Sequence, residues 1–286
     1  MSFTQKTIRT MITLGAGVFE GTQSNSVIIE GLATDVSVEK PGLPDLNKCN
    51  VSISGLSLSK MEQLTMLAFR KRAIAKNAIA VWAGDRGADL GLVFRGEIVA
   101  ASADFNAAPT PVFNIEAKTG VYPLRVPAPP LSVSGETTID GIASRLAHEM
   151  GYDYKNEGVT GSVKNSIYNG SALQKIQRLA DHAGIDLYID DGTVVIAPAG
   201  KTRKAATVPF LSHNTGLLGY PTFSNDGISL SCIYNPNLVV GGQIRVESVV
   251  PCASGYWKIS KLTHSLSAYH AGDWKSEIEA TWLGEV

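Results

Sequence analysis

The sequence has few charged residues, and the charges it has nearly cancel. Asp, Glu, Lys and Arg make up 18% of the 286 residues, below the ~25% of an average soluble protein. The 25 basic and 26 acidic residues give a formal net charge of −1. A protein that grips nucleic acid needs clustered basic charge for most of its affinity, so the composition argues against that class. Low charge together with 28 glycines indicates many turns and surface that other molecules cover.

Cysteine is also scarce. The three cysteines, Cys49, Cys232 and Cys252, are widely spaced and form no CxxC pair. Such an odd, scattered set predicts neither a disulfide framework nor a zinc site. We therefore expect all three to be small buried side chains.

Segments that direct a chain to a membrane are missing from the sequence. Residues 1–15 contain basic residues and lack both an apolar core and a small-residue cleavage site, so they do not read as a signal peptide. No window approaches 18 uncharged apolar residues. We expect a chain that is made in the cytoplasm, does not insert into a membrane, and reaches any other location as part of an assembly.

Motifs that carry catalysis are absent as well. The sequence contains no GxxxxGK[ST] loop, no GxGxxG fingerprint and no GxSxG elbow. His148 and Glu149 begin the zinc-protease motif HExxH, but Tyr152 stands where the second histidine belongs. The other histidines are scattered, and we interpret His264 as a half-buried strand residue and His270 with Asp273 as part of a turn. We predict that the chain is not an enzyme and has no catalytic, cofactor-binding or metal-binding residue.

Two kinds of charged cluster have competing interpretations. Asp190 and Asp191, with Asp186 nearby, offer oxygen ligands for calcium, but the spaced Dx[DN]x[DN]G loop is absent and Asp-Gly favours a tight turn. We therefore predict a turn. The basic clusters are interpreted as solvated surface, with a contact at the edge of a protein assembly as the alternative. They comprise Arg70, Lys71, Arg72 and Lys76, and further along Lys201, Arg203 and Lys204.

The first part of the chain reads mostly as strands. Residues 26–38, 50–53, 91–101 and 112–117 are rich in β-branched residues, and Gly96 suggests a hairpin or a bulge. One helix interrupts the strands, with Ser59 as its N-cap and Glu62 completing a capping box. An apolar stripe then follows at helical spacing, formed by Met61, Leu64, Leu67 and Ala68.

The middle of the chain changes to a helical period. Residues 139–150 predict an amphipathic helix that Thr137 or Thr138 caps and Gly151 ends. A second helix is predicted over 173–183, with a capping box from Ser171 to Gln174. Each helix leads into a similar sequence, RLAHEMGYDY and RLADHAGIDL. An internal duplication and two helices that merely end alike are both open interpretations.

The last part returns to the period of strands. Residues 228–234, 244–250 and 278–282 alternate in polarity, and frequent Gly, Asn and Pro punctuate them. Between Trp257 and Leu266 the apolar parity changes, which predicts a bulge near Ser260. The expected fold class is therefore α+β, mostly β, with two small antiparallel barrel-like domains flanking an αβ middle. The predicted divisions are 1–122, a Pro-rich linker at 123–135, 136–204 and 205–286.

A series of turn and strand motifs in the last part carries a family resemblance. The motifs are GLLGYPTF (216–223), DGI (226–228), YNP (234–236), GGQI (241–244), GYWKI (255–259), LTHSL (262–266) and Trp274. Their order, after a β-rich start and an αβ middle, resembles the baseplate hub proteins of contractile-tailed bacteriophages. This late-control-protein-D-like family is related to the hub part of type VI secretion spike proteins.

The resemblance implies a structural role in a phage tail. Such hubs are homotrimers in which each chain contributes two similar barrel domains, so three chains form a pseudo-sixfold ring between tail tube and central spike. The implied partners are further copies, the tube or tube-initiator protein and the spike, with the tape-measure protein and baseplate wedge as additional contacts. DNA passes only in transit. The implied location is the virion baseplate, after assembly in the host bacterial cytoplasm.

The end of the sequence bears on this resemblance. No needle repeat precedes Val286 and no lysozyme-like domain is inserted, so we expect the spike to be a separate chain. The alternatives are a tail-associated cell-wall hydrolase and a monomeric carbohydrate- or peptide-binding module.

Overall fold

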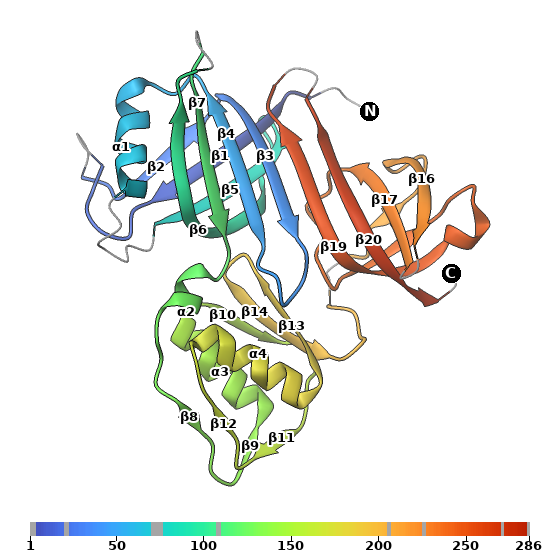
Figure 1. Ribbon diagram of the computed structural model, residues 1–286. Helices are drawn as coiled ribbons and strands as arrows, with labels where there is room; N and C mark the ends of the chain where they lie inside the picture. The colour runs from blue at the N-terminus through green and yellow to red at the C-terminus, as the bar shows by residue number, and fades with distance from the viewer. Residues whose placement is uncertain are drawn as a thin grey trace.

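The chain folds into one large sheet with a smaller αβ section below it (Figure 1). The structure is a computed structural model that describes residues 4–19, 23–69, 77–106, 110–204, 207–224, 227–269 and 272–284. Strands outnumber helices, and the helices gather mainly in the middle of the chain. The predicted fold class, α+β and mostly β, is confirmed.

The first section supplies seven of the described strands and one helix. They are β1 (Lys6–Thr13), β2 (Ser26–Glu30), β3 (Ala33–Lys40), β4 (Lys48–Ser54), α1 (Leu58–Phe69), β5 (Ala78–Asp85), β6 (Gly91–Asp104) and β7 (Val112–Lys118). Along β3, Val36 and Val38 are buried while Asp35 and Glu39 are exposed, because successive side chains of a strand point to opposite faces.

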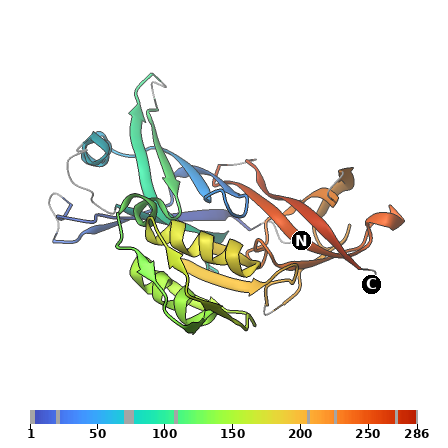
Figure 2. The ribbon, with the colours of Figure 1, turned by 60° about the horizontal axis from the view of Figure 1, so that its bottom comes forward.

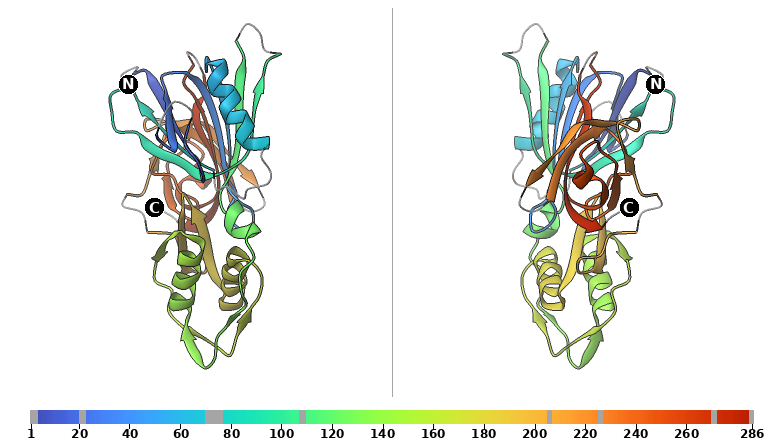
Figure 3. Two further views of the ribbon diagram at one scale, coloured as in Figure 1. Left: turned by 90° about the vertical axis from the view of Figure 1, so that its left-hand side faces the viewer. Right: turned by 90° about the vertical axis from the view of Figure 1, so that its right-hand side faces the viewer.

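The middle section combines short strands with three helices. They are α2 (Val121–Arg125), β8 (Leu131–Ser132), β9 (Glu136–Thr138), α3 (Ile139–Met150), β10 (Asp153–Asn156), β11 (Ser162–Lys164), β12 (Ile167–Tyr168), α4 (Ala172–Ala183), β13 (Ile185–Asp190) and β14 (Thr193–Pro198). Side views show this section as a lobe that extends away from the large sheet (Figure 3).

The last section is again made of strands. They are β15 (Phe210–Leu211), β16 (Leu217–Ser224), β17 (Gly227–Ile233), β18 (Gln243–Val246), β19 (Gly255–Ser267) and β20 (Trp274–Gly284), with one 3₁₀ turn at Pro251–Ala253. With the lower end of the molecule turned forward, the β6–β7 hairpin rises from the large sheet on the side away from the αβ lobe (Figure 2).

A single junction joins the first and last sections into one sheet. The strand order is β16-β17-β20-β19-β3-β4-β7-β6-β5-β1-β2, with β18 and β15 branching from β19. β3 pairs with β19 in antiparallel register from Lys40 opposite Leu262 to Asp35 opposite Ser267. Because β3 already has β4 and β19 as neighbours, it has no edge left for β2. The described strands of the first and last sections therefore share one open sheet and form no closed barrel.

The predicted helices of the middle section are confirmed. Thr138 caps α3 by accepting a hydrogen bond from the Gly141 N–H, and Ser171 and Gln174 form the capping box of α4. Gly151 and Gly184 end the two helices with φ of 72° and 61°, in the left-handed region that glycine adopts without penalty. The strands that follow, β10 and β13, flank β14 on opposite sides. An internal duplication and two helices that merely end alike both stay open interpretations.

Two local predictions for the first section are wrong. α1 begins at Leu58, so Ser59 lies inside the first turn and is not the N-cap; the Met61 N–H already donates to the Ser57 carbonyl. Gly96 forms neither a hairpin nor a bulge, because β6 continues through it and the bulges of this strand lie to either side, at Val93 and Val99. A Cβ at Gly96 would lie 2.8 Å from the Lys118 carbonyl oxygen, so close packing explains this glycine.

Two other local predictions are confirmed. The register between β19 and β20 shifts between Ile259 and Lys261, which leaves Ser260 as the extra residue of a bulge. Asp191 and Gly192 have φ of 50° and 84° and form the two-residue turn between β13 and β14.

Buried apolar side chains form three clusters that follow the three sections. One lies in the first section, one in the αβ lobe around α3 and α4, and one in the last section around Trp257. Leu266 of β19 belongs to the first cluster, so the core as well as the sheet crosses the junction. The division into domains stays a prediction. None of the described helices combines the length and apolar character needed to cross a bilayer.

Candidate assembly surfaces

One face of the large sheet is polar across both of its halves. Cross-strand partners in an antiparallel sheet share a face, so the pairing register identifies the residues that lie on it. On β17, β20, β19, β3, β4 and β7, from the Lys261–Glu279 pair to β7, the hydrophilic ones are Ser229, Ser231, Lys275, Glu277, Glu279, Lys261, Thr263, Ser265, Ser267, Asp35, Ser37, Glu39, Lys48, Asn50, Ser52, Ser54, Asn114, Glu116 and Lys118. We call this set the polar face.

The polar face is nearly neutral and has no arginine or aromatic residue. It carries five carboxylates and four lysines, and two of the pairs, Lys118–Glu116 and Lys261–Glu279, are each 3.2 Å apart. Where β3 meets β19, the face has a shallow hollow of about 310 Å³. The apolar residues in the same rows, Ala33, Val112 and Ile233, stand at the ends of their strands. The face suits contact with water and holds no feature that would grip a polyanion.

Large apolar side chains gather instead at the outer end of the sheet. Tyr220 and Phe223 on the terminal strand β16 are 70% and 54% exposed, and Leu218 on the same strand is exposed too. Trp282 and Leu283, near the end of β20, are likewise exposed. Such a concentration on a terminal strand is typical of a surface that another protein covers. We call these five residues the apolar rim.

A buried ionic cluster joins the αβ lobe to the large sheet. Lys40, the last residue of β3, places its Nζ 2.7 Å from Asp190 Oδ1 and 3.0 Å from Asp191 Oδ2 in the β13–β14 turn. An Arg203 nitrogen lies 3.7 Å from Asp190 Oδ2, and Asn47 donates to the Ile189 carbonyl oxygen at 3.0 Å. Because Lys40 is only 5% exposed, its charge depends on these partners.

The cluster moves the ionisation of its members in different directions. Burial alone would lower the pKa of Lys40, but the two carboxylates outweigh it and hold that pKa above its ordinary value. Lys40 likewise outweighs burial at Asp190 and lowers its pKa. At Asp191 burial prevails over Lys40 and raises the pKa to about 6.

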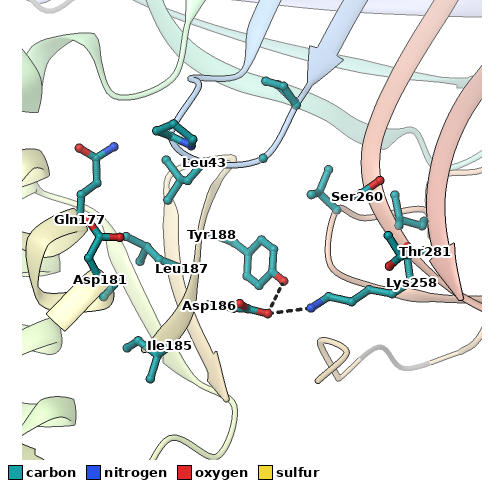
Figure 4. Close-up of a pocket in the computed structure, with 16 residues that line it drawn as sticks. Leu43, Gln177, Asp181, Ile185, Asp186, Leu187, Tyr188, Lys258, Ser260 and Thr281 are labelled. Atoms are coloured by element: carbon teal, nitrogen blue, oxygen red, sulfur yellow. Dashed lines mark hydrogen bonds and ion pairs between the residues drawn. The ribbon is translucent and has the colours of Figure 1, made fainter. Parts of the chain in front are cut away.

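A cleft opens between the αβ lobe and the last section. It encloses about 730 Å³ between the β3–β4 loop, α4 with β13, and the neighbouring strands β19 and β20. In Figure 4, Asp186 and Tyr188 point across the cleft toward Lys258, while Gln177 and Asp181 line the opposite wall. Lys258 Nζ lies 2.7 Å from Asp186 Oδ2, and the Tyr188 hydroxyl donates to the same oxygen at 3.3 Å.

The histidines singled out in the sequence do not come together. His264 is 3% exposed, more buried than expected, and its Nδ1 lies 2.8 Å from Ser276 Oγ. Burial, with a smaller contribution from Lys40, lowers the pKa of His264 to about 3, so the imidazole is neutral at physiological pH. His148 lies on the surface of α3, and His182 contacts the Tyr168 hydroxyl. His270 lies outside the described residues.

The cysteines and acidic groups give a mixed outcome. Cys49 and Cys232 are buried as expected, but Cys252 is exposed in the 3₁₀ turn, where no strand alternation turns it inward. Asp191 lies in the predicted turn, and Asp190 precedes it as the last residue of β13. In the part of the chain that the structure describes, no three His, Cys, Asp or Glu side chains are placed to hold a metal ion.

The two basic clusters also have different outcomes. Arg203 is an internal partner of Asp190 and stacks over Tyr188, with its guanidinium 5.3 Å from the ring centroid, so it is not a solvated residue. Burial of its stem in the ionic cluster explains the difference. The cluster formed by Arg70, Lys71, Arg72 and Lys76 lies outside the described residues.

Sequence reasoning missed the polar face and the role of Lys40. The sequence of β3 contained a pattern that points to both. Asp35, Ser37 and Glu39 alternate along the strand and therefore lie on the same face. Lys40 falls on the other parity, with Val36 and Val38, so its side chain is turned toward the interior. A lysine at a buried position needs a carboxylate partner, but the sequence does not say which one.

Solved structures with this architecture come from phage tails and secretion machines. A tail protein from Neisseria meningitidis MC58 matches with a TM-score of 0.65 at 10% identity, over 96% of each chain. The 43 kDa tail protein of prophage MuSo2 from Shewanella oneidensis matches with a TM-score of 0.62 at 13% identity, again over 96% of each chain. At these identities the likeness shows a shared fold.

A third structure links the fold to secretion. The E. coli c3393 protein is a type VI secretion component described as similar to the T4 tail proteins gp27 and gp5. It matches with a TM-score of 0.62 at 12% identity, over 96% of this chain and 77% of that one. No curated protein sequence matches the chain.

The fold is thus shared with proteins of these kinds, and the sequence shows the family to which the chain belongs. The family model described as baseplate hub gp41 matches residues 8–272. The chain belongs to this baseplate hub family and is a structural hub component of a phage tail.

Proposed function

We propose that three copies of this chain form a pseudo-sixfold ring that joins the tail tube to the central spike. The junction of β3 and β19 carries this proposal, because it sets two β-sections of one chain edge to edge in a single sheet. Three chains then supply six such sections. A ring of this kind meets a sixfold tube on one side while keeping threefold symmetry toward a spike.

In this ring the polar face lines the central channel, through which DNA passes. The face runs without interruption across the β3–β19 junction. It offers no arginine for bidentate phosphate contacts and no aromatic ring for stacking bases. Its nearly balanced charge leaves a passing polyanion weakly held, as a passage requires.

The apolar rim supplies contacts between neighbouring copies. Leaving side chains as large as Tyr220 and Phe223 in water is unfavourable, and covering them with a neighbour gains roughly 25 cal/mol per Å². The tube or tube-initiator protein and the spike contact the two ends of the ring. The tape-measure protein and baseplate wedge are further partners, and assembly takes place in the host bacterial cytoplasm.

The chain acts in this role without catalysis. His264 and Ser276 resemble the first two members of a hydrolase triad, but both are buried, at 3% and 0% exposure, so substrate has no access. The imidazole of His264 is neutral because it is buried in the packed sheet, so its neutrality needs no catalytic explanation. Unchanged peptidoglycan turnover by tail particles that carry His264→Gln supports this reading, and loss of turnover would revive the hydrolase alternative.

The oligomeric state tests the ring. Light scattering should give three times the chain mass, and negative-stain images should show a ring with a central hole. Tyr220→Ser with Phe223→Ser should reduce both trimer formation and incorporation into tail particles. Ile167→Ser, an equally exposed apolar site on the αβ lobe, serves as the control. A chain that stays monomeric and is absent from tail particles rules out the ring.

DNA ejection tests the channel. Asn50→Arg with Asn114→Arg adds six guanidinium groups to the polar face of a trimer and should slow ejection while particles still assemble. The matched control places arginine at Ser134 and Asn169, which are exposed on the αβ lobe. Equal ejection rates for the two pairs would show that the polar face lies elsewhere.

A further inference from the structure

The small sheet of the αβ lobe has one edge that opens into the cleft. Its strand order is β10-β14-β13, so among the described strands β13 has a partner on one side only. Ile185, Asp186, Leu187 and Tyr188 of β13 all line the cleft. The edge of a strand presents backbone N–H and C=O groups that are ready to pair with another extended chain.

The register identifies the backbone groups that point outward. Asp190 and Thr193 flank a two-residue turn and therefore form a hydrogen-bonded pair. Residues 188 and 186 share that orientation, whereas 189, 187 and 185 direct their N–H and C=O away from β14. The bond that the Ile189 carbonyl accepts from Asn47 confirms this assignment. No described residue makes such a bond to the outward groups of Leu187.

The side chains leave this edge accessible. Leu187 packs into the core of the αβ lobe, so what it presents to the cleft is its backbone. Asp186 and Tyr188 point to the other side, where Lys258 holds them. An open stretch of four residues spans about 13 Å at ~3.3 Å per residue.

The charge of the cleft favours extended segments that carry a basic side chain. Lys258, the Tyr188 hydroxyl and the Gly200 N–H all occupy one oxygen of Asp186, which leaves Asp181 as the remaining carboxylate on the opposite wall. Asp181 is exposed in the last turn of α4, where the helix dipole is also negative. A cationic side chain is the complement at this end.

We propose that the open edge of β13 binds an extended segment of another tail protein as an added strand, with a lysine or arginine beside Asp181. The occupant is an extended backbone because only that geometry matches alternating outward N–H and C=O groups. The inference rests on the proposed place of the chain in a tail, which supplies the partner.

Peptide binding tests the proposal. Overlapping twelve-residue synthetic peptides that cover the tube, spike, tape-measure and wedge proteins of the same phage are titrated against the purified full chain by fluorescence anisotropy. At least one peptide with a basic residue should bind at micromolar concentration, and methylation of its alternate backbone amides should weaken binding at least tenfold. Absence of any binding peptide overturns the proposal.

Variants of β13 and α4 distinguish binding by backbone pairing from binding by side-chain contacts in the cleft. Leu187→Pro removes an outward N–H that β14 does not use and should weaken binding at least tenfold. Leu187→Ala loses comparable side-chain contacts but keeps the N–H, and should bind within threefold of the parent. An equal loss of peptide affinity in both variants overturns the pairing.

Asp181→Lys, at an exposed site, should weaken peptide binding about fivefold. Unchanged peptide affinity in this variant overturns the charge assignment, and this test holds even where Leu187→Pro does not fold.

Ring formation and tail incorporation are measured on the same preparations. Rings that bind no peptide overturn this inference alone. A peptide-binding chain that forms no ring and enters no tail particle overturns the proposed function alone.

Discussion

The first section is connected to the last section and to the αβ lobe by very different means. The first and last sections join through a backbone ladder between β3 and β19, with one buried histidine, His264, opposite Val38. The αβ lobe joins through the ionic cluster, in which Lys40 serves two aspartates. Both connections begin on β3, yet one uses hydrogen bonds that any residue can make and the other depends on a few named side chains.

The difference predicts opposite sensitivities to substitution and to pH. A backbone ladder tolerates most changes to its solvated side chains, whereas removing one partner of a buried ion pair leaves an uncompensated charge. His264 is held neutral, and burial raises the pKa of Asp191 to about 6. Between pH 6 and pH 4, acid should therefore remove stability through His264 and add stability through Asp191.

The largest expected effect comes from breaking the ionic cluster at its centre. Lys40→Met should lower the free energy of unfolding by about 3–5 kcal/mol, because two buried carboxylates lose their shared cation. Urea denaturation at pH 7 and fixed protein concentration measures it. Lys40→Met with Asp191→Asn, which leaves Asp190 facing Arg203, should be milder than the single change. A double variant as unstable as the single one would contradict the charge argument.

The next effect belongs to the ladder and depends on pH. The folded-state pKa of His264, about 3, lies below the ~6.5 of an unfolded histidine, so the folded state binds fewer protons between these values. Stability is complete above pH 6.5 and should fall by about 2–4 kcal/mol as pH drops toward 3. His264→Gln should flatten this slope. His148→Gln, at an exposed site, should keep it; the same slope in both variants would assign the loss to other groups.

A smaller effect should distinguish the two adjacent aspartates, because their substitution is expected to change stability in opposite directions. The pKa of Asp191, about 6, lies above the ~3.9 of an unfolded aspartate, so this group removes stability as pH rises from 4 through 6. Asp191→Asn should therefore raise stability by about 1–2 kcal/mol at pH 8 and change little at pH 4. Asp190→Asn should lower it at pH 8, because both cations lose their closer partner. Destabilisation by both variants at pH 8 would disprove the assignment.

The smallest expected effect tests the tolerance of the ladder. Thr263→Ala lies on the polar face, opposite Glu39 across the β3–β19 junction. It should change the free energy of unfolding by less than about 0.5 kcal/mol, as solvated substitutions usually do. A loss above about 2 kcal/mol would show that side chains, and not the backbone, hold this junction.

Local signals explain which parts of the fold could be predicted from the sequence. A few neighbouring residues determine each of the features that were predicted correctly, namely the caps of α3 and α4, the Asp-Gly turn and the bulge at Ser260. The start of α1 was missed because both Ser57 and Ser59 resemble caps, and Gly96 because a glycine inside a strand reports close packing as often as a turn.

The assembly surfaces could be predicted only in part. The family resemblance placed the chain among tail hubs, as the family model now shows. The polar face could not be found from sequence, because solvent-facing and channel-facing positions share one alternation. The partners of Lys40 lie 150 residues away, and no local pattern encodes such a contact.

The pairing of Lys40 with Leu262 means that β3 is synthesised well before the strand that pairs with its outer edge. The two residues are 222 positions apart, so at ~5–20 residues per second the outer edge of β3 leaves the ribosome roughly 10–45 s before its partner strand. During that interval the emerging chain carries an unpaired strand that another nascent copy on the same message can reach. We expect synthesis of this hub to depend on what shields that strand until the last tenth of the chain appears.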